Sequence, residues 1–405
     1  MNRLVIIDGL RTPFCRMGTD LATLGADELG RIAVSALLTR TGLDPALIDE
    51  VIFGCVGQPM DSANIARVIA LRAGIPEKVP AATVHRNCAS GFEAFTSAYE
   101  RMCAGRGSVF LVGGTESMSQ VPMVFQEETA AKFAALGKAK SSARKLAALA
   151  AFRPSDIEPR IGLKMGLTDP VCGMGMGDTA ELLAREHGIS REEQDAFALR
   201  SHQRAVAAEA RLAEEICPVW LGGNAIVKDN GPRPDTSAEA LAGLRPIFDP
   251  YGSVTAGNSS QITDGAVALL VMSEERALEL KLKPIGALTA YAYTGCDPRR
   301  MGLGPVSAIA AANERGGLKL ADADLVEVNE AFAAQVLAVD KLLPLPQDRL
   351  NVNGGSIALG HPVGATGARL ILSSLRELAR RGARRALLSL CVGGGQGGAI
   401  WLEHL

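Results

Sequence analysis

The chain alternates short apolar runs with longer stretches that have the periodicity of helices. Continuous apolar runs bounded by turn residues are typical of strands that are buried on both faces. In the N-terminal third such runs occupy Leu4–Ile7, Val51–Phe53, Ala82–Val84 and Val109–Val112. Helix-like segments between them include Glu28–Thr41 and Ser90–Cys103.

The C-terminal third repeats this rhythm. Its segments are Ile285–Tyr293, Ala308–Asn313, Leu325–Val328, Leu350–Val352, Ala365–Arg380 and Ala386–Ser389. Strand–helix alternation of this kind predicts an α/β fold built in layers.

The two ends of the chain also resemble each other. Residues 49–57 and 323–332 each combine an acidic turn, a strand and a polar loop. Residues 84–95 and 351–372 each combine a strand, a small-residue turn and a helix. This predicts a duplicated α/β unit, with an active site where the two halves meet.

Residues 119–247 interrupt the repeat. The basic, Ala-rich stretch Ala130–Phe152 predicts a helix, and Thr179–Ala210 predicts an amphipathic helix followed by the loop KDNGPRPDTS. We therefore expect an inserted loop domain at 119–247 that covers the site. The N-terminal half would comprise residues 1–118 completed by 248–274, and the C-terminal half residues 275–405.

Composition and charge narrow the function. The 405 residues are 47% hydrophobic and carry a net charge of −2, so there is no overall electrostatic basis for nucleic-acid binding. No stretch approaches the roughly 20 apolar residues of a membrane span, and the apolar N-terminus leaves no room for a signal peptide. The eight cysteines form no C-x-x-C motif and have no His at zinc-finger spacing. We expect reduced thiols, no metal site and a cytoplasmic protein.

Cys88 lies in VHRNCASGFEAF, between an expected strand and an expected helix. Unpaired N–H groups at the start of that helix would favour the thiolate and lower the pKa of the thiol. Ala89, Ser90 and Gly91 leave space for a substrate. Cys88 is therefore a candidate nucleophile, although a single cysteine is more often a buried structural residue.

His361 is one of five histidines and lies in the glycine-rich GGSIALGHPVGATGAR, a turn that enters a helix at Ala365. Such a turn can bring an imidazole close to a ligand, and a capping or core histidine is the alternative. Asn329 follows a strand in VNEAFAAQ. It could hold a water or a carbonyl oxygen, or cap the next helix.

Cys391 ends the apolar run ALLSLC and precedes VGGGQGG, whose glycines could present N–H groups to a developing oxyanion. Residues 393–398 also match G-x-G-x-x-G, the dinucleotide-binding pattern. That pattern needs a following helix and an acidic residue about 20 positions later. Here the strand-like AIWLEHL follows, so a dinucleotide site is not expected.

In that order and context, NCASG, NEAF, GHPVGATG and CVGGGQGG resemble the four active-site blocks of the thiolases. MGMGDTAE, VTAGNSSQITDGA and MGLGP resemble further blocks, and the likeness runs from about Ile6 to Trp401. The resemblance implies a five-layered α/β/α/β/α fold of two duplicated halves. It also implies acyl transfer between an active-site cysteine and coenzyme A.

The resemblance assigns roles to individual residues. Cys88 would carry the acyl group, and His361 would activate Cys88 and help bind the thioester oxygen. Asn329 would hold a water that completes this oxyanion hole. Cys391 would move the proton at the substrate α-carbon, and the Gly393 and Cys88 N–H groups would form a second oxyanion hole. A thioester needs a soft nucleophile and returns a thiolate, so we expect coenzyme A and acyl-CoA as substrates and no metal or redox cofactor.

The same likeness places Arg233, in GPRPDTS, on a phosphate of coenzyme A, and a solvated loop charge is the alternative. The residues that correspond to the pantetheine groove are Ser260, Ala256, Leu167, Phe248 and Phe332.

Two departures from the family pattern bear on the length of the acyl chain that the enzyme would prefer. Gly175 stands where short-chain biosynthetic thiolases usually carry His. The basic stretch from Ala130 to Arg160 resembles the β-subunits of fatty-acid-oxidation complexes, but those subunits commonly carry His at the position of Asn329.

We expect thiolysis of 3-ketoacyl-CoA, or the reverse Claisen condensation, in fatty-acid β-oxidation. A dedicated acetoacetyl-CoA-forming acetyltransferase is the enzymic alternative. A non-catalytic acyl-CoA or lipid-binding protein would be expected to lack a catalytic residue, and a ketoacyl synthase would lack the second cysteine.

Expected partners are acyl-CoA and coenzyme A, further copies of the chain in a homodimer or homotetramer, and a hydratase/dehydrogenase subunit. The basic 130–152 segment adds the hypothesis of peripheral membrane contact.

Overall fold

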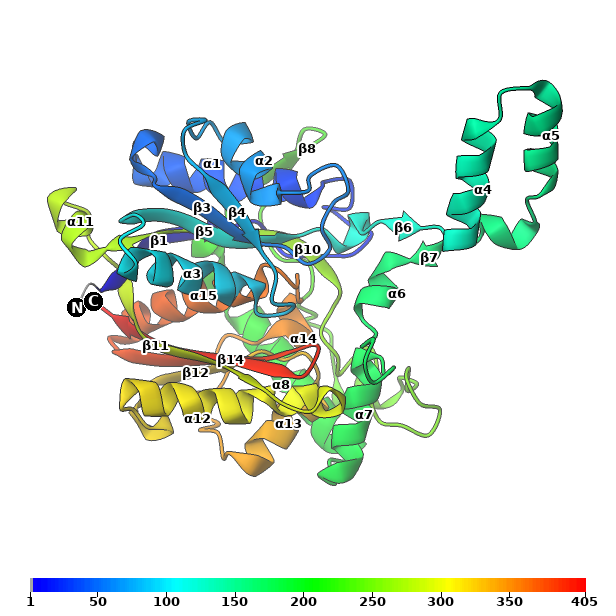
Figure 1. Ribbon diagram of the computed structural model, residues 1–405. Coiled ribbons are helices and arrows are strands. Elements are labelled where there is room, and N and C mark those ends of the chain that lie inside the picture. The colour runs from blue at the N-terminus through cyan, green and yellow to red at the C-terminus, as the bar shows by residue number, and fades with distance from the viewer. Residues whose placement is uncertain (1–2) are drawn as a thin grey trace.

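The computed structural model describes residues 3–405, in which helices and sheets alternate in five layers (Figure 1). One outer layer holds α1 (Ala26–Thr41) and α2 (Ile65–Arg72). The other holds α12 (Gly304–Gly316) and α13 (Ala333–Leu342). The predicted five-layered α/β fold is confirmed.

Each sheet comes mainly from one half of the chain. The order in the N-terminal sheet is β4 (Ala81–Val84), β3 (Glu50–Gly54), β5 (Val109–Glu116), β10 (Thr263–Ser273) and β1 (Leu4–Arg11). The order in the C-terminal sheet is β12 (Leu325–Val328), β13 (Arg385–Val392), β14 (Gln396–His404) and β11 (Gly286–Gly295). The two sheets meet where β1 and β11 pair, Val5 with Ala287 and Ile6 with Gly286.

The two sheets share one topology. β3 pairs in parallel with β4 and β5, and β12 pairs in parallel with β13. β5–β10 and β13–β14 are both antiparallel. On the other side of β12, Val326 forms a parallel bridge with Leu350, in the position that β4 occupies beside β3. The halves are therefore structural duplicates, as the sequence predicts.

The predicted strand at Leu350–Val352 is wrong beyond that single bridge. Asn351 has a φ of 47°, a left-handed conformation that ends extended pairing. Its side-chain amide replaces the next backbone pair, because it accepts a hydrogen bond from Val328 N–H and donates one to Val328 O, both at 2.9 Å.

The predicted helix at Thr179–Ala210 is also interrupted. The chain forms α7 (Met176–Glu186) and α8 (Arg191–Ala207) instead. Gly188 has a φ of 57°, and Ser190 caps α8 by accepting from the Glu193 N–H. Glycine after a helix and a Ser-x-x-Glu capping box are the usual signals for such a break.

The predicted single helix at Ala130–Phe152 is two helices, α4 (Glu127–Lys138) and α5 (Ser142–Ala150). They form a hairpin on a short two-stranded stalk of β6 (Met123–Val124) and β7 (Arg160–Ile161). The hairpin points away from the layered body (Figure 1). The expectation that the 119–247 insertion covers the site is therefore wrong for this part of it.

The other elements are short. They are β2 (Cys15–Arg16), α6 (Gly162–Gly166), α9 (Glu209–Leu212), β8 (Val219–Leu221), β9 (Asn224–Ile226), α10 (Ala238–Ala242), α11 (Glu274–Glu279) and α14 (Ser356–Leu359). Among residues 3–405, no helix combines the length and the apolar character that crossing a bilayer requires.

The central layer holds α3 (Ser90–Cys103) and α15 (Thr366–Arg381), which pack against each other and against both sheets. Their first turns touch backbone to backbone. A Cβ on Gly91 would lie 2.6 Å from Ala368 N, and a Cβ on Gly367 would lie 2.5 Å from Phe92 N. Both distances are shorter than van der Waals contact allows, so the two helices can approach this closely only with glycine at these positions.

Gly367→Ala should therefore destabilise the protein. Overpacking of a close core contact typically costs about 1–3 kcal/mol, and the better helix propensity of alanine offsets about 1 kcal/mol of this at most. We expect a lower denaturation midpoint in urea and a lower turnover. Gly137→Ala is the matched control, because a Cβ there meets open space on α4. Equal midpoints for Gly367→Ala and the wild type would show that the helices can separate without cost.

Candidate active site

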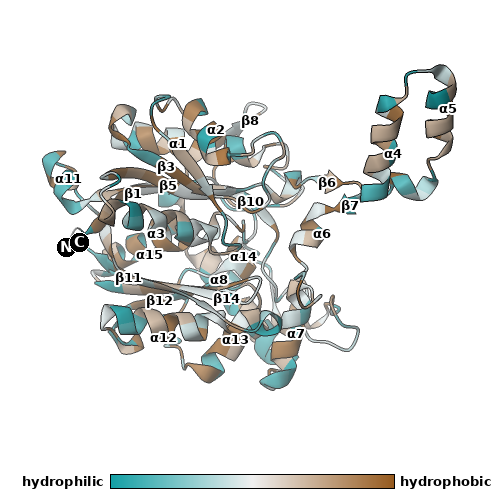
Figure 2. Ribbon diagram, viewed as in Figure 1, coloured by the Kyte–Doolittle hydropathy of each residue, from teal (hydrophilic) through white to brown (hydrophobic). Residues whose placement is uncertain are grey.

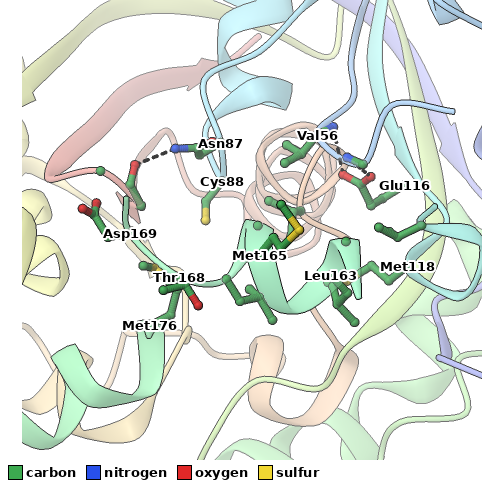
Figure 3. Close-up of a pocket in the computed structure, with 18 of the residues that line it drawn as sticks. Val56, Asn87, Cys88, Glu116, Met118, Leu163, Met165, Thr168, Asp169 and Met176 are labelled. Carbon is green, nitrogen blue, oxygen red and sulfur yellow. Dashed lines mark hydrogen bonds between the residues drawn. The ribbon is translucent and has the colours of Figure 1, made fainter. Parts of the chain in front are cut away.

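A cavity of about 660 Å³ opens where the two halves and the 119–247 segment meet. Four of the five predicted catalytic residues line it, namely Cys88, His361, Cys391 and Gly393. Figure 3 shows the Cys88 thiol pointing into this space, with Leu163, Met165 and Thr168 around it. The lining is mostly apolar, apart from these groups and a few polar side chains.

Cys88 lies in the turn between β4 and α3, two residues before the first residue of α3. The backbone N–H groups of Gly393 and of Cys88 itself interact with the thiol and favour the thiolate. Burial in apolar surroundings outweighs them and raises the pKa of the Cys88 thiol above its usual value. The predicted lowering of this pKa is therefore wrong, and the thiol needs a base to lose its proton.

His361 is buried at the start of the turn that leads into α15. Burial, with a smaller contribution from Arg369, lowers the pKa of His361 to about 4, so the imidazole is neutral at neutral pH. Its Nε2 has no hydrogen-bond partner among residues 3–405. His361 thus brings a neutral ring with an unoccupied nitrogen to the cavity that also contains the thiol.

Thr366 fixes the tautomer of that ring. Its Oγ1 lies 2.6 Å from His361 Nδ1 and donates to Pro362 O at 2.9 Å. Since a hydroxyl has one proton, Thr366 accepts the hydrogen bond from Nδ1–H. Nδ1 is therefore protonated, and the lone pair is on Nε2, the nitrogen that a base would use.

Cys391 lies near the end of β13 and is fully buried. Burial, followed by the proximity of Cys88, raises the pKa of Cys391 well above its usual value. Asn87 donates from Nδ2 to Gly393 O at 2.6 Å and so ties the loop after Cys391 to the loop of Cys88 (Figure 3). Asn87 has a φ of 43°, a conformation that asparagine tolerates better than most residues.

Asn329 is buried immediately after β12 but is not among the residues that line the cavity. Its Oδ1 accepts from Ser356 Oγ at 2.6 Å, and its Nδ2 has no partner among the described residues. The alternative that Asn329 caps the next helix is wrong, because α13 begins at Ala333 with Phe332 as its N-cap.

The residues predicted to hold coenzyme A fall in two places. Leu167, Ser260 and Phe332 line the main cavity. Arg233 and Ala256 line a second, smaller cavity of about 160 Å³.

Phe248 connects with the first group, since its ring meets that of Phe332 edge-on with centroids 6.1 Å apart. Arg233 is exposed at the mouth of the smaller cavity.

Sequence reasoning missed Glu116, which lines the cavity at the end of β5. The carboxylate accepts backbone hydrogen bonds from Val56 (3.1 Å), Gly57 (2.7 Å) and Gly364 (2.9 Å). Burial nevertheless raises the pKa of Glu116. Through these hydrogen bonds Glu116 joins a loop of the N-terminal half to the loop that carries His361. Its only signal in the sequence is an acidic residue at a strand end, in GGTES.

Comparison with known proteins shows the family of the chain. The thiolase N-terminal domain model matches residues 4–275, and the thiolase C-terminal domain model matches residues 282–404. A probable acetyl-CoA acetyltransferase of Escherichia coli is 43% identical over 100% of both chains. A 3-ketoacyl-CoA thiolase of Serratia proteamaculans is 40% identical over 99% of this chain and 97% of its own.

Solved structures show the same relationship. The Bacillus anthracis acetyl-CoA acetyltransferase has a TM-score of 0.91 at 40% identity, with 100% of this chain and 99% of that chain covered. The human mitochondrial 3-ketoacyl-CoA thiolase in complex with CoA has a TM-score of 0.91 at 39% identity, with 100% and 98% covered. The chain belongs to the thiolase family. It is an acyltransferase that makes or breaks a carbon–carbon bond in coenzyme A thioesters, which confirms the enzymic interpretation of the sequence.

Thr366→Val should slow turnover about tenfold to a hundredfold. Valine has nearly the same shape but leaves the buried Nδ1–H without an acceptor, which costs about 1–3 kcal/mol, and about 1.4 kcal/mol corresponds to a tenfold change in rate. The same lost hydrogen bond should lower the urea midpoint, whereas the KM for coenzyme A should stay close to wild type. Thr366→Ser should restore the rate, because it keeps the hydroxyl. A Thr366→Ser variant as slow as Thr366→Val would mean that shape, and not the hydrogen bond, matters.

Proposed function

We propose that this thiolase cleaves 3-ketoacyl-CoAs with Cys88 as nucleophile and with His361 and Cys391 as the two groups that move protons. The observation that carries the proposal is that one cavity brings together two thiols and a neutral imidazole from three separate segments. A nucleophile with a base and a second acid/base is the set that thiolysis requires.

In the first step His361 Nε2 takes the proton of Cys88, and the sulfur attacks the 3-keto carbon. The bond between C2 and C3 then breaks, which leaves the acyl group on Cys88 and an acetyl-CoA enolate. Cys391 gives its proton to C2 of the enolate, and acetyl-CoA leaves. The deprotonated Cys391 takes the thiol proton of a second coenzyme A, whose sulfur attacks the acyl-enzyme. The shortened acyl-CoA leaves, and the Cys88 thiolate takes its proton back from His361.

Two oxyanion holes fit this sequence. The Gly393 and Cys88 N–H groups already face the thiol sulfur and are suited to the oxygen of the carbonyl that Cys88 attacks. Protonated His361 Nε2 and a water held by the unpartnered Asn329 Nδ2 would serve the oxygen of the thioester enolate. This chemistry uses the reactivity of the thioester and requires no metal or redox cofactor.

For coenzyme A, we assign the pantetheine arm to Leu167, Phe332, Ser260, Phe248 and Ala256 and a phosphate to Arg233. The support is that Leu167, Ser260 and Phe332 line the main cavity, that Phe248 packs on Phe332, and that Ala256 and Arg233 line the smaller cavity.

The apolar wall of the cavity favours substrates longer than acetoacetyl-CoA. Beyond Cys88 the lining continues with flexible or aliphatic side chains, namely Val56, Met60, Met118, Val121, Val124, Leu163, Met165 and Val171. Methionines repack easily around variable aliphatic groups. Of these residues, Met60 is 80% exposed and Val171 is 84% exposed, so this end of the cavity is open rather than capped.

We place the enzyme in the cytoplasm, as a homo-oligomer that acts in fatty-acid β-oxidation. All eight cysteines are free, as expected in a reducing compartment. β4 is the terminal strand of its sheet and is only half-buried, which makes it a suitable edge for a second copy of the chain.

Cys88→Ala and Cys391→Ala should fail at different steps. Cys88→Ala should lose both labelling by radioactive acetyl-CoA and turnover. Cys391→Ala should still take up label at Cys88, yet lose exchange of the acetyl-CoA α-hydrogens in deuterated water. Cys103→Ala, at an exposed cysteine, is the control and should behave as wild type. Labelling of Cys88→Ala, or normal exchange by Cys391→Ala, would contradict the respective role.

Thiolysis of ten- to sixteen-carbon 3-ketoacyl-CoAs should match or exceed that of acetoacetyl-CoA. Gly175→His should shift preference toward four carbons, because Gly175 has a φ of −69° that any residue tolerates and lies next to Leu167 and Met176 of the cavity. Gly137→His, in open space on α4, is the control. An enzyme that cleaves acetoacetyl-CoA alone would instead be the short-chain acetyltransferase.

A further inference from the structure

A buried histidine on α8, His202, has no role in the site described above. Helix α8 lies inside the layered body, where it packs against α10, α13 and α14 (Figure 2). The His202 side chain is only 4% exposed. It lines the smaller cavity of about 160 Å³ together with Arg233 and Ala256. Burial of a polar ring costs free energy unless its nitrogens find partners, so the partners of the two nitrogens decide what the residue does.

One nitrogen of His202 holds the loop that carries Arg233. The backbone N–H of Arg233 donates to His202 Nδ1 at 3.2 Å. Pro232 and Pro234 flank Arg233 and have no N–H, so this is the only backbone donor of residues 232–234. His202 therefore fixes the backbone beside the guanidinium that we assign to a phosphate of coenzyme A.

The same hydrogen bond fixes the tautomer of His202. Burial, followed by the positive charge of Arg233, lowers the pKa of His202 to about 4, so the ring is neutral at neutral pH. A neutral imidazole has one N–H, and since Nδ1 accepts a hydrogen bond, the proton is on Nε2. The bond from Arg233 is the only hydrogen bond of the ring among residues 3–405. Nε2–H is therefore an unpartnered donor at the wall of the smaller cavity.

The surroundings of this donor suit an uncharged acceptor. Arg233 is exposed at the mouth of the cavity, where an anion can keep most of its hydration. A group inside the cavity loses its hydration, which costs an ion far more free energy than it costs an amide. The rest of the lining is mostly aliphatic or small, with Ala240, Leu241, Leu244, Ala256, Gly257 and Ile357.

We propose that His202 binds coenzyme A by donating a hydrogen bond from Nε2 to an amide oxygen of the pantetheine arm. The proposal rests on the proposed function, which assigns this arm to Ala256 in the same cavity and a phosphate to Arg233. Pantetheine has two amides, and an amide oxygen is a strong acceptor without charge. His202 thus serves both parts of the ligand, because Nδ1 holds the loop for the phosphate and Nε2 contacts the arm.

Two substitutions separate the two nitrogens. The amide of asparagine is attached at Cγ, as Nδ1 is, whereas glutamine is one carbon longer and places its amide near Nε2. His202→Asn should keep the acceptor for the Arg233 N–H and lose the donor to the ligand. Its KM for coenzyme A in the thiolysis of acetoacetyl-CoA should rise about tenfold, which is the usual effect of one lost hydrogen bond. The kcat should stay at the wild-type value, because the contact is the same in ground state and transition state.

Pantetheine as the acyl acceptor identifies the group that His202 contacts, since it has both amides but no phosphate and no adenine. His202→Asn should raise the KM for pantetheine by the same factor as that for coenzyme A. His202→Gln should keep the KM for pantetheine within about threefold of wild type, because it retains a donor. Arg233→Ala should raise the KM for coenzyme A alone. His404→Asn is the matched control, at a histidine whose Nδ1 lies 2.8 Å from Ile285 O on β14, and should change neither KM.

A loss with coenzyme A and none with pantetheine would overturn the proposal, because the contact would then be at the nucleotide end. Equal losses for His202→Asn and His202→Gln on pantetheine would overturn it too, since shape and not the Nε2 donor would matter. If Arg233→Ala raises the KM for coenzyme A while His202→Asn changes neither KM, this inference fails and the assigned phosphate contact stands. An unchanged KM for coenzyme A in Arg233→Ala contradicts the phosphate contact instead, and the KM of His202→Asn for pantetheine still decides the role of His202.

Discussion

The close backbone contact between α3 and α15 is the constraint on which the site depends. Gly91 and Gly367 let the two first turns touch, and Gly114 of β5 admits the Gly364 carbonyl, since a Cβ there would lie 1.9 Å from that oxygen. Cys88 precedes α3 and His361 precedes α15 by only a few residues. The separation of the helices therefore sets the separation of thiol and imidazole. A side chain between the helices would move the two groups apart even if both were retained.

The same burial that brings these groups together keeps them uncharged. Burial raises the pKa of Cys88 and Cys391 and lowers that of His361 to about 4. An isolated buried charge costs several kcal/mol, so a resting thiolate and imidazolium would be unfavourable in this cavity without substrate. Proton transfer between neighbours, with oxyanion donors already in position, avoids a lasting buried charge. Two carboxylates, Glu116 and Asp169, line the cavity, and three backbone N–H groups from two loops stabilise Glu116.

The motifs of the candidate site were predictable because each combines an unusual residue with a local structure that suits it. Cys88 at the start of a helix, His361 among glycines and Cys391 at a strand end all occur where the sequence indicates. The predicted secondary structure is wrong where a side chain bonds to a backbone far away in the sequence, or where a local capping signal competes with apolar periodicity. Asn351 ends a predicted strand by bonding to Val328, 23 residues away. The break between α7 and α8 has a signal in the sequence, Gly188 followed by the Ser190 capping box. The apolar periodicity that continues on both sides favoured a single helix instead.

By itself the sequence determined the α/β class, the duplication, the family and which residues we propose as reactive, since these depend on local periodicity and short motifs. Only the tertiary structure decided how those residues work together. The direction of the Cys88 pKa shift depends on desolvation by surrounding segments, which outweighs the local helix effect that the sequence suggests. The roles of Glu116 and Asn87 depend on loops from opposite halves of the chain. The basic stretch at 130–152, too, is predicted as one helix from the sequence, and only the fold shows that it forms the α4–α5 hairpin, which projects from the body. Such properties come from contacts between distant segments, which a linear pattern does not specify.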